Sequence, residues 1–125
     1  MKILDTNVAI DHLRGLPQAV ALLEDLAERG ENIVASEVVR IELLAGVRES
    51  EQAALEIFCD ALGWLPVNEE IARGAGELAG RHRRSYQGID IVDYIIAATT
   101  LALGGELLTT NVKHYPMLEG LSPAY

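Results

Sequence analysis

The sequence predicts an α/β domain with a mostly parallel central sheet of four or five strands, covered by helices on both faces. Short apolar runs alternate along the chain with longer stretches of helical periodicity. Strands that are separated by helices need crossover connections, and such connections produce parallel sheets. The length of 125 residues suits one domain, and the chain has no repeat, low-complexity tract or linker-like stretch. We therefore expect a single domain over residues 1–125.

The first half of the chain contains two strand-like runs, each followed by helical sequence. The expected elements are a strand at 2–4, helices at 7–14 and 17–29, a strand at 32–35, and a helix that runs to about Val47. Pro17 occupies a favoured first-turn position, and Gly30 ends that helix. Ser36 is a suitable N-cap for the helix that follows the second strand.

The second half repeats the alternation. The expected elements are a helix at 50–62, a strand at 64–67, a helix that runs to about Arg84, a helix at about 90–103, and a strand at 106–110. Asn68 is positioned to cap the helix after the third strand, and Gly104-Gly105 ends the last helix. The LSP segment at 121–123 would supply a fifth, edge strand.

Composition and charge narrow the class of protein. The chain is 50% apolar with a mean hydropathy of +0.17, yet no apolar run approaches the roughly 20 residues that span a bilayer. Without a signal-peptide pattern after Met1-Lys2, we expect a cytoplasmic protein with no membrane contact. The single Cys59 cannot form an internal disulfide and is interpreted as a small buried hydrophobe. A net charge of −9 argues against simple nucleic-acid binding, so action on phosphates would need a divalent metal or a basic partner.

Two aspartates stand at the head of an unusually apolar segment, GIDIVDYIIAATT at 88–100. No charged side chain occurs between Tyr94 and Gly105, and a carboxylate is costly to bury without a partner, a proton or a cation. Asp90 is either the N-cap of the helix or an accessory ligand. Asp93 lies inside the first turn, which favours a functional role for it.

Glu42 also falls on an apolar helix face. At 100° per residue, its neighbours on that face are Val38, Val39, Ala45 and Gly46, whereas Arg40 falls on the far side. The expectation is therefore an inward-facing carboxylate. It either pairs with an arginine from another element or faces a cluster of carboxylates around a metal.

Two further polar residues follow predicted strands. Asp5 comes directly after the first strand and Asn111 follows the fourth, at the edge where parallel sheets form their sites. As alternatives, Asp5 or Thr6 caps the next helix, Asn111 ends a strand, and His114 is a satisfied loop residue.

Together these residues could converge on a cation. Carboxylate and amide oxygens suit Mg²⁺ or Mn²⁺, whereas zinc or copper would need histidines or cysteines, which are scarce here. Mg²⁺ held by carboxylates serves phosphoryl chemistry by lowering the pKa of a bound water and neutralising phosphate charge.

The order and spacing of DTN at 5–7, the helix SEVVRIELLAGV, DYIIAATTLALG and LLTTNVKHYP resemble the PIN-domain ribonucleases. The resemblance covers essentially the whole chain and is greatest for the toxin half of VapBC-type toxin–antitoxin pairs. It implies a three-layer α/β/α domain that binds Mg²⁺ or Mn²⁺ and cleaves RNA.

Matched position by position, the resemblance assigns roles to individual residues. Asp5, Glu42 and Asp93 would be the acidic metal ligands, and Asn111 takes a fourth catalytic position where many relatives carry Asp. Asp90 would be an extra acid beside them. The side chains expected to orient these carboxylates are Thr6, Asn7 and Thr110.

The resemblance also implies partners, namely an RNA substrate, a cognate antitoxin and a second copy in a homodimer. The one basic cluster, RHRR at 81–84, is either a solvated helix end or a contact with RNA or antitoxin through Arg81, Arg83 and Arg84.

Three other classes of protein share parts of this pattern. A receiver-type signalling domain would need an aspartate at the end of the mid-chain strand WLPV, where none stands. A haloacid-dehalogenase-type phosphatase would need a second Asp two residues after Asp5, and Asn7 is there instead. A catalytically silent binding module stays open because Asn111 weakens the acidic set.

Overall fold

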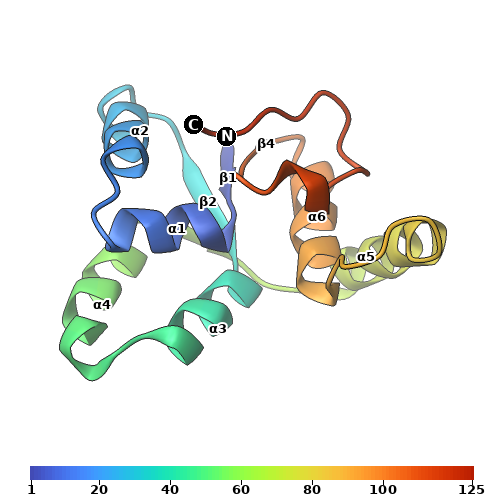
Figure 1. The fold of residues 1–125 in the computed structure, drawn as a ribbon, viewed down its shortest axis with the longest axis horizontal. Helices are drawn as coiled ribbons and strands as arrows, with labels where there is room; N and C mark the ends of the chain where they lie inside the picture. The colour runs from blue at the N-terminus through green and yellow to red at the C-terminus, as the bar shows by residue number, and fades with distance from the viewer.

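The computed structural model describes residues 1–125 as a four-stranded parallel sheet between layers of helices (Figure 1). The strands are β1 (Lys2–Leu4), β2 (Ile33–Ser36), β3 (Gly63–Leu65) and β4 (Glu106–Leu108). Their order in the sheet is β3-β2-β1-β4, and every neighbouring pair is parallel. The predicted three-layer α/β/α class is confirmed.

Six α-helices and two short 3-10 turns complete the chain. They are α1 (Thr6–Leu13), α2 (Pro17–Glu28), α3 (Glu37–Gly46), η1 (Glu49–Glu51), α4 (Gln52–Asp60), α5 (Glu69–His82), α6 (Ile91–Leu103) and η2 (Val112–His114). In Figure 1, α1, α2 and α4 lie on one side of the sheet, and α5 and α6 lie on the other. Helix α3 contacts both α1 and α6. No helix has the length and apolar character needed to cross a membrane.

The predicted boundaries differ from the structure at a few ends. Strand β3 stops at Leu65 because Pro66 has no backbone N–H to continue the ladder. Helix α5 ends at His82, two residues before the expected Arg84. The expected fifth strand at 121–123 is not formed; the tail makes one backbone hydrogen bond here, from Ala124 N–H to Thr109 O at 2.8 Å.

The interior position of β1 determines where the site lies. Ile3 and Leu4 have no exposed surface and belong to a core of 25 buried apolar residues. Leu4 pairs with Leu108 in the β1–β4 ladder, so the chain leaves both strands at the same level. As a result, Asp5 and Thr109 emerge side by side at the carboxyl edge of the sheet.

Helix α6 packs along this edge and is buried on most sides, as its apolar sequence predicts. Gly104 ends it in the left-handed conformation, with φ of 61°, which lets Gly105 N–H donate to Thr100 O at 3.2 Å. The turn leads the chain directly into β4. Helix α6 and β4, whose carboxyl end lies beside Asp5, are therefore consecutive elements joined by a short turn.

Candidate active site

Asp5 is the most buried acidic residue of the predicted set. Its side chain follows β1 and caps α1, with Oδ1 accepting from Thr6 N–H at 2.8 Å. Its other oxygen, Oδ2, accepts from Thr109 Oγ1 at 2.7 Å. The residue is only 6% exposed, and no lysine or arginine lies within salt-bridge distance. Asp5 is therefore both a helix cap and a buried carboxylate without a cationic partner.

The threonine that orients Asp5 is Thr109, not the expected Thr110. Thr109 is fully buried, and its hydroxyl also accepts from Asn111 N–H at 2.9 Å. Thr110 is exposed and makes no side-chain hydrogen bond. The reason is alternation: when the residue after β4 points toward Asp5, the next residue points away from it.

Asp93 lies in the first turn of α6 and is 14% exposed at its side chain. Its Oδ2 accepts from Asp90 N–H at 3.1 Å, and His114 Nδ1 lies 3.1 Å from the same oxygen. Because a carboxylate can only accept, His114 donates here through Nδ1–H. The Tyr115 hydroxyl donates a longer bond of 3.4 Å to Oδ1. Asp93 thus has partners on both oxygens, from a backbone N–H, a histidine ring and a phenol hydroxyl.

Asp90 occupies the N-cap position of α6, with an extended backbone and an exposed side chain. Its N–H donates to Asp93, as in a capping box. This arrangement supports the capping interpretation for Asp90. The role of accessory ligand stays untested.

Glu42 differs from the expectation drawn from the helical projection. Val38, Val39 and Leu43 are the buried residues of α3, whereas Ala45 and Gly46 are exposed because the end of the helix extends beyond the core. Glu42 is exposed as well, and no cation pairs with it. Its Oε1 accepts from Thr6 Oγ1 at 2.6 Å, so the side chain is turned toward the Asp5 end of the sheet.

Hydrogen bonds connect the predicted residues into one network. Thr6 links Asp5, through its N–H, to Glu42, through its hydroxyl. Thr109 links Asp5 to the backbone of Asn111. Tyr115 donates to Asp93, and its hydroxyl lies close enough to Asp5 to affect the pKa of that carboxyl. The residues therefore converge, although three different helices and two strand ends carry them.

The side chains of the two predicted amides, Asn7 and Asn111, are among the least hydrogen-bonded of the predicted set. Asn111 starts η2 and is half-buried, and its side chain makes no hydrogen bond. Asn7, in the first turn of α1, has a buried Oδ1 without any hydrogen-bond donor. A buried, unpaired carbonyl oxygen is unusual and is costly unless a partner arrives.

Two pKa shifts follow from this environment. Burial raises the pKa of Asp5, and the nearby charge of Asp93 adds to the rise, while hydrogen bonds from Thr109, Thr6 and Tyr115 oppose it. Burial also raises the pKa of Tyr115, with Asp5 and Asp93 adding to the effect. Tyr115 therefore keeps its proton and acts as a hydrogen-bond donor between the two carboxylates.

The sequence reasoning missed Tyr115 and gave His114 no role at the site. Both come from the segment after β4 and reach Asp93, on α6, across the end of the sheet. The available signal was their position three and four residues after Asn111, in a segment already predicted to leave the sheet beside Asp5. The pairing with Asp93 could be seen only in three dimensions.

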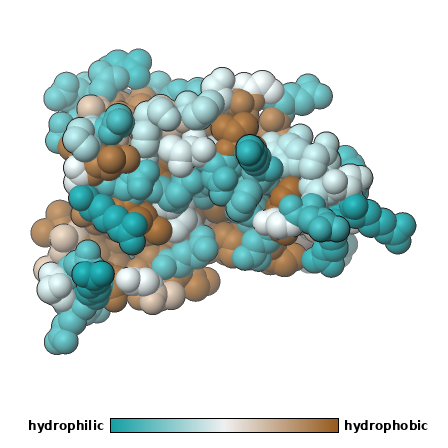
Figure 2. Space-filling model, viewed as in Figure 1, coloured by the Kyte–Doolittle hydropathy of each residue, from teal (hydrophilic) through white to brown (hydrophobic).

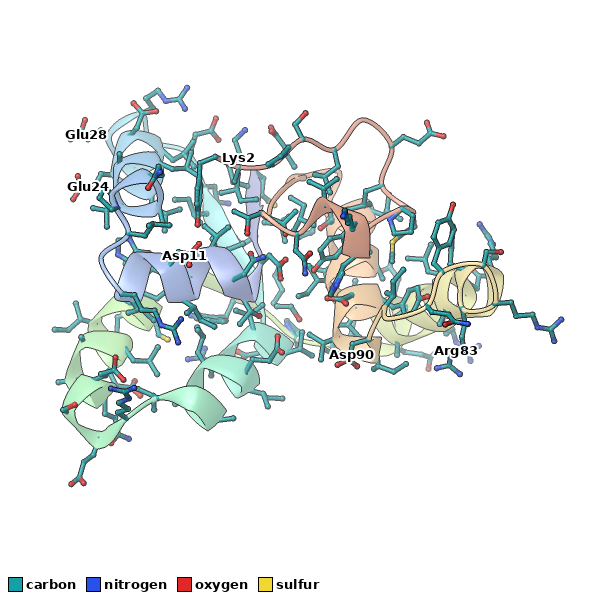
Figure 3. All side chains as sticks on the ribbon, in the orientation of Figure 1. Lys2, Asp11, Glu24, Glu28, Arg83 and Asp90 are labelled. Atoms are coloured by element: carbon teal, nitrogen blue, oxygen red, sulfur yellow. The ribbon has the colours of Figure 1, made fainter.

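The basic cluster lies at the end of α5 and the start of the loop to α6. Arg81, Arg83 and Arg84 are exposed and form no ion pair, in contrast to Arg73 on the same helix, which pairs with Glu69 at 3.0 Å. Figure 3 shows Arg83 and Asp90 along the same lower edge, at neighbouring ends of α5 and α6. The acidic side chains Glu24 and Glu28 lie at the opposite end of the molecule (Figure 3).

The chemistry of the side-chain oxygens at the site suits a hard divalent cation. The free oxygens come from carboxylates and amides, and Asp5 is a nearly buried carboxylate with no cation to balance it. As the side chains stand, no three carboxylate, imidazole or thiol groups lie close enough to enclose an ion. Asp5 and Asp93 both lie beside the Tyr115 hydroxyl, and Glu42 would have to turn inward from Thr6 to join them.

Comparison with known proteins identifies relatives of the chain. The PIN domain family matches residues 2–115. Ribonuclease VapC19 from Mycobacterium tuberculosis is 58% identical over 125 residues, which is the full length of both chains. A toxin–antitoxin complex from Klebsiella pneumoniae contains a chain with the same fold, at a TM-score of 0.84 and 21% identity, covering 100% of this chain and 98% of that one.

A second solved structure is VapBC2 from Rickettsia felis, bound to a DNA fragment from its promoter. Its matching chain has a TM-score of 0.82 and 25% identity, and the match covers 96% of this chain and 94% of that one. The family match covers nearly the whole chain, and the 58% identity extends over its full length. The chain therefore belongs to the PIN-domain family, within its VapC branch.

Proposed function

We propose that this protein is an endoribonuclease that hydrolyses RNA phosphodiester bonds with Mg²⁺ or Mn²⁺ held by Asp5 and Asp93. The observation that carries the proposal is the pairing of these two carboxylates, 88 positions apart in the sequence, around one neutral hydroxyl and without any cation. Glu42 and Asn111 supply the remaining oxygens. The 58% identity to a protein named as a ribonuclease supports the choice of RNA as substrate.

Each residue would have a different role, which depends on its position in the site. Asp5 and Asp93 would hold the ion, and when bound it would lower the pKa of a water molecule and neutralise charge on the phosphate. Thr109 and Thr6 fix the two oxygens of Asp5, which keeps that carboxylate in one orientation. Glu42 is the mobile member, because a single hydrogen bond to Thr6 holds it.

The test is an RNA-cleavage assay with Mn²⁺, using a pool of single-stranded and structured RNA oligonucleotides whose ends are sequenced after cleavage. Asp5→Asn and Asp93→Asn keep the shape of each side chain and remove its charge, so we expect both to lose cleavage. EDTA should abolish the wild-type activity. Cleavage that persists in EDTA, or in either variant, contradicts the proposal, and metal binding without any cleavage indicates a silent binding module.

The RNA would approach along the α5–α6 edge. Arg81, Arg83 and Arg84 have no carboxylate partner in a chain of net charge −9, so their charge is available to phosphates. The loop they begin leads to Asp90 and Asp93 at the start of α6. This gives the substrate a basic contact beside the acidic site.

A cognate antitoxin is the second proposed partner, as in the VapBC2 complex. A groove of about 490 Å³ lies between α1, α3, η1 and α4, with apolar walls from Ile10, Leu43 and Leu55. Arg14, Arg48 and Glu42 also line the groove. An antitoxin segment with apolar and basic side chains would fill it and reach Glu42 from outside. Co-purification with a candidate antitoxin, followed by loss of cleavage, tests this contact.

Homodimer formation is the third proposal. Ile41, Leu44 and Ile57 are exposed on α3 and α4, where Figure 2 shows hydrophobic surface at the lower left. Such a patch favours association with a second copy. Sedimentation analysis should find a dimer that Ile41→Glu weakens, and a wild-type monomer at micromolar concentration would contradict this.

A further inference from the structure

Two residues of the site have no role in the reaction as described so far, His114 and Tyr115. His114 is the last residue of η2 and Tyr115 follows it, and together they supply donors to both oxygens of Asp93. Tyr115 is 1% exposed, although a phenol hydroxyl is polar and a histidine or phenylalanine of similar shape could fill the space. The hydroxyl itself faces the acidic residues: it donates to Asp93 and lies close to Asp5.

We propose that Tyr115 and His114 are positioning residues that hold Asp93 beside Asp5, where the two carboxylates would bind a divalent cation. Two carboxylates this close repel each other, and no positive side chain lies between them. The Tyr115 O–H offers the shared neutral contact, while His114 fixes Asp93 from the opposite oxygen. This inference rests on the proposed metal site and adds the residues that shape it before the ion arrives.

The geometry distinguishes this role from ordinary packing. The Tyr115 ring belongs to the buried core, so its apolar part already contributes to folding. Only the hydroxyl reaches the carboxylates, and it can be removed alone by Tyr115→Phe. His114 is 40% exposed at its side chain and contributes little to the core, so its role can be tested without a large cavity.

The chain supplies a matched control in Tyr94. This tyrosine is also 1% exposed and lies next to Asp93 on α6, but its hydroxyl is buried without any hydrogen-bond partner. Tyr94→Phe therefore removes the same atom from an equally buried site that does not touch the carboxylates. A general effect of losing a buried hydroxyl would appear in both variants, and a positioning effect only in Tyr115→Phe.

The experiment measures Mn²⁺ binding directly, by calorimetry and by the Mn²⁺-dependent shift of the melting temperature. For Tyr115→Phe we expect a loss of about tenfold to hundredfold in Mn²⁺ affinity, the range found when residues that orient metal ligands are changed. Tyr94→Phe should bind Mn²⁺ as the wild type does. His114→Ala should also bind more weakly, and His114→Asn should recover part of the loss because its amide can donate from a similar position.

Each outcome decides between the proposals. Equal Mn²⁺ affinity in wild type, Tyr94→Phe and Tyr115→Phe overturns the positioning role and leaves the ribonuclease proposal intact. Equal losses in Tyr94→Phe and Tyr115→Phe also overturn it, since they would reflect the loss of any buried hydroxyl. A wild type that binds no Mn²⁺ overturns both proposals together. A melting temperature in EDTA that matches the wild type confirms that a variant with weak binding is folded.

Discussion

The two sides of the site are built differently. On the β1–β4 edge, Asp5 and Asp93 are nearly buried and each has hydrogen bonds to both carboxylate oxygens. On the α3 rim, Glu42 is exposed, lines an open groove and has one hydrogen bond. The comparison indicates that one half of the site is formed in advance by the fold. The other half is left adjustable, at the place where a partner or substrate would reach it.

The difference follows from where each carboxylate stands on its element. Asp5 and Asp93 lie at the start of helices, where backbone N–H groups point toward them and hold them. Glu42 lies in the middle of α3, where every backbone N–H is already used within the helix. A side chain in that position depends on neighbours from other elements for its orientation.

Removing charge from the preformed half should have the largest effect. Asp5→Asn should lower the cleavage rate by about a thousandfold or more, because a preorganised charge in a buried site is lost. Single-turnover cleavage of an RNA oligonucleotide in Mn²⁺ measures the loss. A loss of less than tenfold would mean that the β1–β4 edge is not the centre of the chemistry.

The basic cluster should affect affinity for RNA. Replacing Arg81, Arg83 and Arg84 with alanine should reduce the slope of log affinity against log salt by about 2, at about 0.7 per phosphate contact on a single strand. The measurement is RNA binding by the inactive Asp5→Asn chain over a salt series. Arg73→Ala is the control, since this residue is already paired with Glu69. An unchanged slope contradicts an RNA contact by the cluster, and lysine replacements should retain it.

Glu42, on the α3 rim, should tolerate substitution better than Asp5 does. Glu42→Gln keeps an oxygen that can accept from Thr6, so we expect a loss of about tenfold to hundredfold in cleavage, smaller than for Asp5→Asn. Metal titrations in parallel should show weaker Mn²⁺ binding with little change in the EDTA melting temperature. An effect as large as that of Asp5→Asn would erase the distinction between the two halves.

The smallest effect concerns the stability of the metal-free chain. Burial raises the pKa of Asp5 above the ordinary value of 3.8, so the folded chain keeps this proton to a higher pH than the unfolded chain does. The contribution of Asp5 to stability is then fully present below about pH 4 and is lost as the pH rises through the raised pKa. In EDTA, Asp5→Asn should gain stability over the wild type as the pH rises across that window. Urea unfolding at several pH values measures this, and a constant difference contradicts it.

The sequence predicted the fold well because its signals are local. Gly30, Ser36 and Asn68 act within one or two turns of their own elements, and the structure has a helix boundary at each. The alternation of strands and helices then leaves few topologies. The fifth strand failed because its evidence was one short apolar segment without a partner strand.

The site could be predicted only in part, for a physical reason. Periodicity identifies the face of a helix but not where the core ends along it, so Glu42 was placed inward while the end of α3 extends into solvent. Strand alternation could have separated Thr109 from Thr110, because even the predicted strand at 106–110, two residues longer than β4, puts their side chains on opposite faces. The contacts of Tyr115 depend on the packing of η2 over α6, which no local pattern reports.

The ladder between β1 and β4 has one more consequence, in the order of folding events. Asp5 and Thr109 meet across 104 positions of sequence, a long separation whose closure is among the slowest kinds of step for a small domain. During synthesis, Asp5 is made before its hydroxyl partner Thr109 and before Tyr115. The network around Asp5 therefore cannot form until the ribosome has passed Tyr115 and β4 has paired with β1.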